Sequence, residues 1–244
     1  MGFTEEQERY FYEFLEILNR TNALSSVILV GSWAEYLYEK ENILSGFVSL
    51  AKTTDVDFLL NEDKNIKPEN IIKPAQQKDF EYKEDYMSGT SKFWKKEFEI
   101  EFLTSQNGDG TKPVQRSSFG INAQPLTHIG FIRDNYITAR HNGLDINIPA
   151  PEAYVLQKMI INDRRGVKAV GDRMKIERLL PYLNKSYFEK IYTGLHKKER
   201  SLVDKYIKEY CPEIREATEK DIVQIYKEIQ RNSGNDATKD PKLK

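Results

Sequence analysis

The chain has 244 residues, with 39% hydrophobic and 31% charged side chains, which excludes a largely disordered protein and allows one large or two small domains. Residues 1–150 carry 16 Lys and Arg against 23 Asp and Glu, whereas residues 151–232 carry 18 against 13, a division that disfavours binding along duplex nucleic acid. The single cysteine, Cys211, and the lack of a long apolar run exclude a disulfide framework and a membrane span, and predict a cytoplasmic protein.

The first predicted elements are a helix and a buried strand. Apolar residues recur at helical spacing over residues 5–20, and Thr4 with Gln7 forms a capping box before them. A short apolar run over residues 27–30 then predicts a buried strand that stops at Gly31.

A second helix is predicted to start at once, with Ser32 and Glu35 as its capping box, and to run to about residue 43. The stretch "TTDVDFLL", residues 53–60, reads as the next buried strand. The polar segment 61–77 contains two prolines and predicts a loop with one helical turn.

The middle of the chain predicts antiparallel strands. Three consecutive strands are expected over residues 79–87, 91–95 and 97–103. Asn142 and Gly143 predict a hairpin turn between strands at 135–140 and 144–148.

The hydrophobic period becomes helical after Pro149 and Pro151. We therefore predict an α+β protein with three parts: an N-terminal helix and a domain built on a mixed sheet over residues 1–148, an all-helical domain over 149–232, and a disordered tail over 233–244. The expected helices cover residues 151–163, 168–180, 186–195, 199–209 and 219–231.

Acidic residues lie within two of the predicted buried strands. Side chains alternate along a strand, so Asp55 and Asp57 project from one face, and Glu99 and Glu101 likewise share a face of the strand "FEIEFL". If the two strands are neighbours, a third carboxylate joins the two aspartates. Three such oxygen ligands suit one or two Mg²⁺ ions, with Mn²⁺ as an alternative, and such ions recruit phosphate oxygens. The alternative is that Asp55 and Asp57 lie at a strand end, where they face solvent or pair with Lys52.

The order Gly31-Ser32, "TTDVDFLL" and "FEIEFL" resembles the DNA polymerase β-like nucleotidyltransferase superfamily, and within it the free-standing bacterial members of the abortive-infection and toxin-antitoxin type. The resemblance covers roughly residues 25–180. It implies a mixed sheet with flanking helices, a nucleotide such as ATP as substrate, and Mg²⁺ as cofactor. The implied metal ligands are Asp55, Asp57 and Glu101, with Glu99 as the alternative third ligand, and the implied nucleotide-binding residues are Gly31, Ser32 and Lys158.

The predicted function is transfer of a nucleoside monophosphate from an NTP to an acceptor hydroxyl, with release of pyrophosphate. An RNA end, a protein and a small molecule all remain open as acceptors, and neither a membrane nor a long duplex is expected as a partner. The alternatives are a nucleotide-binding or partner-binding module without turnover and a metal-dependent phosphoesterase. For Lys158, the other interpretation is an ammonium that reaches solvent from an apolar helix.

Overall fold

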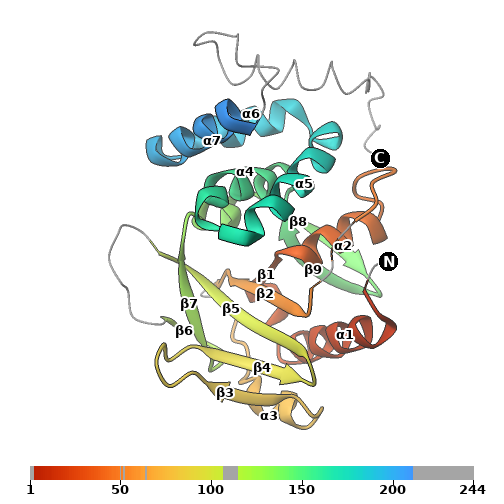
Figure 1. The fold of residues 1–244 in the computed structure, drawn as a ribbon. Helices are drawn as coiled ribbons and strands as arrows, with labels where there is room; N and C mark the ends of the chain where they lie inside the picture. Colours follow the sequence, from red (N-terminus) through yellow and green to blue (C-terminus); the bar gives the residue numbers. More distant parts are fainter. Residues whose placement is uncertain (1–2, 50, 52, 64, 107–114, 211–244) are drawn as a thin grey trace. The chain divides into compact units, whose positions relative to one another are not determined.

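The computed structural model describes residues 3–49, 51, 53–63, 65–106 and 115–210 (Figure 1). The predicted helix at 219–231, the predicted tail and Cys211 lie outside the described residues.

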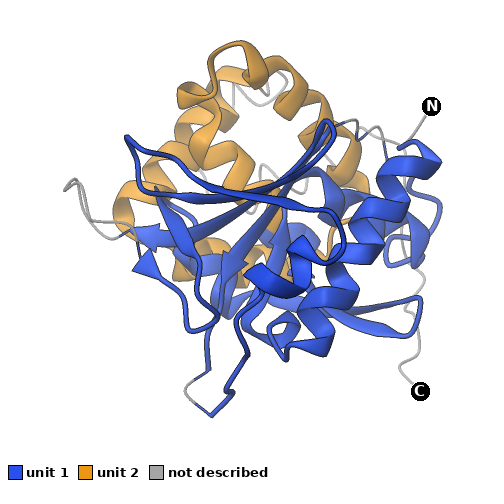
Figure 2. Ribbon diagram, turned by 90° about the horizontal axis from the view of Figure 1, so that it is seen from below, with its two compact units in different colours: residues 1–153 blue, residues 154–244 orange. Residues whose placement is uncertain are grey.

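The chain divides into two compact units, Met1–Ala153 and Tyr154–Lys244 (Figure 2). The division falls inside one helix, α4 (Pro151–Ile161), a few residues after the boundary predicted from the sequence. The first unit contains the strands, and the described part of the second is helical.

The first unit is built on a mixed sheet in which β1, β2, β5, β4 and β3 lie side by side in that order. Strand β2 is parallel to β5, and the other neighbours along this row are antiparallel. Strand β7 pairs in parallel with the end of β5, and β6 pairs with β7. The strand bounds are β1 Val27–Val30, β2 Asp55–Leu60, β3 Glu81–Glu84, β4 Ser91–Lys95, β5 Phe98–Gln106, β6 Gln115–Arg116 and β7 Asn122–Thr127.

Helices flank this sheet, so the predicted mixed sheet with flanking helices and further C-terminal helices is confirmed. A separate hairpin forms around the predicted Asn142-Gly143 turn, whose two residues have φ of +48° and +80°. The first unit contains α1 (Glu5–Arg20), α2 (Ser32–Lys40), α3 (Ile72–Gln76) and the hairpin strands β8 (Tyr136–His141) and β9 (Leu144–Pro149). The second contains α5 (Ala169–Leu179), α6 (Lys185–Gly194) and α7 (Lys197–Tyr210). None of the described helices has the length and apolar character needed to cross a bilayer.

Helix α1 covers one face of the sheet. The predicted Thr4 capping box is present, and the apolar side of the helix is buried. Phe14, which is 1% exposed, has its ring centroid 6.2 Å from that of Phe58 on β2 and 5.3 Å from that of Phe93 on β4. Burial of aromatic side chains of this size contributes about 2–3 kcal/mol each, so α1 is part of the core of the first unit.

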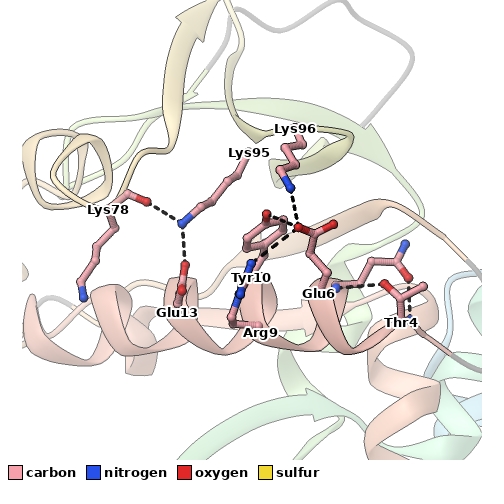
Figure 3. Close-up of polar contacts among 9 residues, drawn as sticks. Thr4, Glu6, Arg9, Tyr10, Glu13, Lys78, Lys95 and Lys96 are labelled. Carbon is pink, nitrogen blue, oxygen red and sulfur yellow. Dashed lines mark hydrogen bonds and ion pairs between the residues drawn. The ribbon is translucent and has the colours of Figure 1, made fainter.

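Polar contacts also join α1 to the turn between β4 and β5 (Figure 3). The ammonium of Lys95 lies 2.7 Å from the Glu13 carboxylate, and that of Lys96 is paired with Glu6. Tyr10 donates to Glu6 at 2.7 Å. These contacts fix the hairpin on the helix at the end of the sheet where Asp55 and Glu99 lie.

The face of the sheet that is not covered by α1 is apolar at one end of the strands and acidic next to it. At the end where β2 and β5 finish, Leu59 and Leu103 pack with Val30 and with Ile129 and Ile132 in a buried cluster. Asp57 and Glu101 lie two residues earlier on the same face as Leu59 and Leu103. The acidic side chains therefore border an apolar layer.

One sequence prediction about α2 is wrong. Its N-cap is Gly31, not Ser32, and Glu35 is buried at 2% exposure, where it accepts a hydrogen bond from the Ser49 hydroxyl. A capping box requires the acidic side chain to reach back to the N-cap, and this one is turned into the protein instead.

Candidate active site

The turn between β1 and α2 lies directly against Asp57. Gly31 has φ of +73° and ψ of −154°, a conformation that side chains strongly disfavour. A Cβ atom added there would lie 2.9 Å from Oδ2 of Asp57. The glycine is therefore needed both for the turn and for the close approach of this carboxylate to the N-terminus of α2.

The turn also supplies an anion-binding feature of a general kind. Ser32 is the first residue of α2, and the first amides of a helix have no partner within the helix. These amides and the helix dipole favour negative charge at this point. The location of Gly31 and Ser32 is thus compatible with their predicted phosphate contacts, which stay a prediction.

Strand pairing brings the predicted acids together on one face of the sheet. Asp57 is the cross-strand partner of Glu101, and Asp55 is the partner of Glu99. Residues paired in this way project to the same side. Asp55 is held locally by its Thr54 neighbour, whose hydroxyl donates to its carboxylate at 3.2 Å. Both candidate third ligands therefore belong to the strand beside the aspartates.

Lys92 on β4 supplies a cation that the sequence interpretation did not place. It is the cross-strand partner of Glu101 on the side away from Asp57, and its ammonium forms ion pairs with both Glu101 and Glu99. Burial alone would lower the pKa of the Lys92 ammonium, but the bonds to Glu101 and Glu99 outweigh it and raise that pKa. One lysine thus neutralises part of the charge of two glutamates.

The two glutamates respond differently to this shared cation. Burial, with the neighbouring Glu99 charge, raises the pKa of Glu101, although Lys92 acts in the opposite direction. Burial also acts to raise the pKa of Glu99, but the hydrogen bond from Lys92 outweighs it and lowers that pKa. Glu101 is therefore the weaker acid of the two.

Among the residues that the structure describes, no group of three or more His, Cys, Asp and Glu side chains lies close enough together to hold a metal ion. The residue types and their strand positions are nevertheless those that Mg²⁺ prefers, and the Asp57 carboxylate lies against Gly31 at the N-terminus of α2. Asp55, Asp57 and Glu101 can hold the cation together only if Glu101 exchanges its bond with Lys92 for a bond with the metal.

Lys158 lies in the second unit, on α4, and is buried at 5% exposure. Its ammonium donates to Asp172 at 2.7 Å and lies 4.8 Å from the centre of the Tyr154 ring. Arg165 binds the other oxygen of Asp172 at 2.8 Å. Asp172 thus pairs with both Lys158 and Arg165 within the second unit, and the predicted phosphate contact of Lys158 stays a prediction.

Lys92 is the residue that sequence reasoning missed at the candidate site. A signal was present in the sequence, because the tight connection at Lys96 and Glu97 pairs Lys95 with Phe98. Counting back from that pair places Lys92 opposite Glu101.

The fold and the strand-borne acids beside a glycine turn are features of a nucleotidyltransferase. The nucleotidyltransferase family matches residues 10–190, and this match covers more than half of the sequence. The chain belongs to this nucleotidyltransferase family, in agreement with the resemblance to the polymerase β-like superfamily.

Two solved structures are similar to this chain over most of its length. An antigenic nucleotidyltransferase-like protein from Paracoccidioides brasiliensis is 13% identical, with a TM-score of 0.47, and the match covers 88% of this chain and 93% of that one. The antibiotic-resistance factor ANT(2'')-Ia is 11% identical, with a TM-score of 0.41, and the match covers 85% and 94%. No curated protein sequence matches significantly.

Proposed function

We propose that this protein is an active, metal-dependent nucleotidyltransferase that transfers a nucleoside monophosphate from an NTP to an acceptor hydroxyl and releases pyrophosphate. The observation that carries the proposal is the pairing of Asp57 with Glu101 on neighbouring strands while Asp57 lies against the Gly31 turn. Family membership supports the reaction class.

Asp55, Asp57 and Glu101 would hold the divalent cation, with Glu99 as the alternative third ligand. When bound, Mg²⁺ would supply positive charge against the phosphate oxygens and favour deprotonation of the acceptor hydroxyl. The amides at Gly31 and Ser32 bind and orient the terminal phosphates. The Glu101 carboxylate helps to take the proton of the acceptor hydroxyl. The protein thus contributes position and charge, and it forms no covalent bond with the nucleotide.

The acceptor is an RNA end, a protein or a small molecule. A cytoplasmic location stays a prediction that depends on the single Cys211. Assignment to the abortive-infection or toxin-antitoxin type is likewise a prediction from the sequence resemblance.

The test is an assay with each α-labelled NTP and Mg²⁺ against a panel of RNA, protein and small-molecule acceptors. Asp57→Asn removes a metal-binding charge, so we expect it to reduce label transfer and pyrophosphate release at least about a hundredfold. Asp145→Asn is the matched control, because it makes the same change at a 65% exposed side chain on β9. Equal turnover by Asp57→Asn and Asp145→Asn would overturn the mechanism.

A second candidate is a nucleotide-binding or partner-binding module without turnover. The observation that favours it is the bridge from Lys92 to Glu99 and Glu101, which compensates part of the acidic charge in the absence of a metal. Calorimetry with NTP and Mg²⁺ separates the two functions: binding without any product across the panel would support the module. Hydrolysis of the NTP without an acceptor would instead indicate a phosphoesterase.

A further inference from the structure

A single row of paired residues crosses the acidic part of the sheet. From β1 to β3 it consists of Val30, Asp57, Glu101, Lys92 and Lys83, each the cross-strand partner of the next. Paired residues share a face, so two acids are followed by two lysines along this row. Glu101 therefore has a carboxylate on one side and an ammonium on the other.

Lys92 is the lysine that engages the acids. Its ammonium bonds with Glu101 and Glu99, and its side chain is 28% exposed, against 23% and 25% for these two. Lys83 is instead 67% exposed and pairs with Glu81 at 3.3 Å. Ion pairs that are partly withdrawn from water are screened less than surface pairs, so the Lys92 bridge is the stronger of the two.

A metal at the aspartates and the Lys92 ammonium require the Glu101 carboxylate in two different positions. A divalent cation at Asp55 and Asp57 requires a Glu101 oxygen on the β2 side, whereas Lys92 holds the side chain toward β4. Resting on the proposed function, we propose that Lys92 is a built-in counter-ion that competes with the divalent cation for Glu101 and retains Glu99 when the metal binds.

This arrangement has two consequences for the candidate site. In the metal-free protein, Lys92 offsets the repulsion between the Glu99 and Glu101 charges, which lie on one face of one strand. When the metal binds, Lys92 keeps its bond with Glu99, so Glu101 becomes the third ligand. The lysine thereby sets the affinity for metal and selects between the two glutamates.

Calorimetric titration of the metal-free full chain with Mn²⁺ tests this competition without any activity measurement. In Lys92→Met the competing bond is gone, and we expect Mn²⁺ to bind about tenfold more tightly, the factor set by one hydrogen bond between charged groups. Lys83→Met is the matched control, since it removes the same charge from the adjacent position of the row without touching Glu99 or Glu101. Its affinity for Mn²⁺ should stay within about twofold of wild type.

Thermal unfolding gives a second readout. Lys92→Met should unfold at a lower temperature than wild type in EDTA, and Mn²⁺ should raise its unfolding temperature more than that of wild type. Lys92→Gln keeps a hydrogen-bond donor without the charge, and it serves if Lys92→Met does not fold. Glu101→Gln should weaken Mn²⁺ binding more than Glu99→Gln, because Glu101 is the glutamate that Lys92 releases.

The outcomes separate this inference from the proposed function. If wild type and Lys92→Met bind Mn²⁺ with equal affinity, the metal site stands and the competition is refuted. Weaker binding by the Lys92 variants would refute it as well, since the lysine would then support the metal. If neither the wild type nor any of the variants binds Mn²⁺, the proposed metal-dependent function fails together with the inference.

Discussion

The close approach of Gly31 to Asp57 makes Gly31→Ala the most informative single substitution. Gly31 has φ of +73° and ψ of −154°, and a Cβ there would lie 2.9 Å from Asp57 Oδ2. Holding alanine in this conformation costs about 1–3 kcal/mol. The Asp57 carboxylate must also shift, so we expect the free energy of unfolding to fall by about 2–4 kcal/mol in total.

Urea unfolding in EDTA, followed by tryptophan fluorescence, measures this loss. Trp33 is fully buried two residues after the substituted glycine and therefore reports on this region. Gly46→Ala is the matched control, because Gly46 has φ of +77° but nothing within 4 Å of an added Cβ. It should cost only about 1–2 kcal/mol, from the backbone conformation alone.

The contact with Asp57 can be isolated by combining Gly31→Ala with Asp57→Ala. In the Asp57→Ala background the alanine Cβ atom no longer meets a carboxylate. The loss in free energy of unfolding caused by Gly31→Ala should therefore decrease by the contribution of that steric contact, and the remaining loss should be that of the backbone strain. A Gly31→Ala protein whose free energy of unfolding stays within about 0.5 kcal/mol of wild type would refute the reasoning, because a neutral result of that size is typical of unconstrained surface positions.

The remaining predictions concern the second unit. Asp172→Ala leaves the buried Lys158 ammonium without this carboxylate, and it should lower the free energy of unfolding, measured by far-ultraviolet circular dichroism, by about 3–5 kcal/mol. Adding Lys158→Met should recover part of that loss. Burial acts to raise the pKa of Asp172, but Lys158 and Arg165 outweigh it and lower that pKa. The stability from this ion pair is therefore fully present above pH 3.8, the ordinary pKa of the carboxyl, and is lost as the pH falls through the lower pKa that Asp172 has in the folded state. If the free energy of unfolding of wild type and of Asp172→Asn depended on acid pH in the same way, this prediction would be contradicted. Gly171 in α5 has nothing within 4 Å of an added Cβ, so Gly171→Ala should raise the free energy of unfolding by about 0.5 kcal/mol, and a decrease would count against helix propensity as the controlling factor.

Much of the fold was predictable because local chemistry determines it. The apolar spacing after the Thr4 capping box predicts α1, and the Asn142-Gly143 pair predicts the β8–β9 hairpin. Both features depend on residues close together in the sequence. Strand β7 and its parallel pairing with β5 were not predicted, since residues 122–127 lack a clear alternating pattern and their partner strand is not adjacent in sequence.

The candidate site was predictable only in part. The alternation along "DVD" and "EIE" gives the shared faces of Asp55 with Asp57 and of Glu99 with Glu101. The pairing of Asp57 with Glu101 needs the parallel register of β2 and β5, which no local pattern specifies. The ion pairs of Lys92 depend in addition on side-chain conformation, which a sequence pattern does not report.

Helix α1 has a practical consequence for work with fragments of this protein. The family match starts at residue 10, inside the helix Glu5–Arg20, and ends at residue 190, inside α6. A fragment cut at those limits would lose Glu6, the anchor of Lys96, and the Thr4 cap, while leaving the rest of α1 to shield the aromatic side of the sheet. We therefore expect expression trimmed to the family limits to yield poorly folded material, whereas a fragment that retains Thr4 keeps the helix start intact.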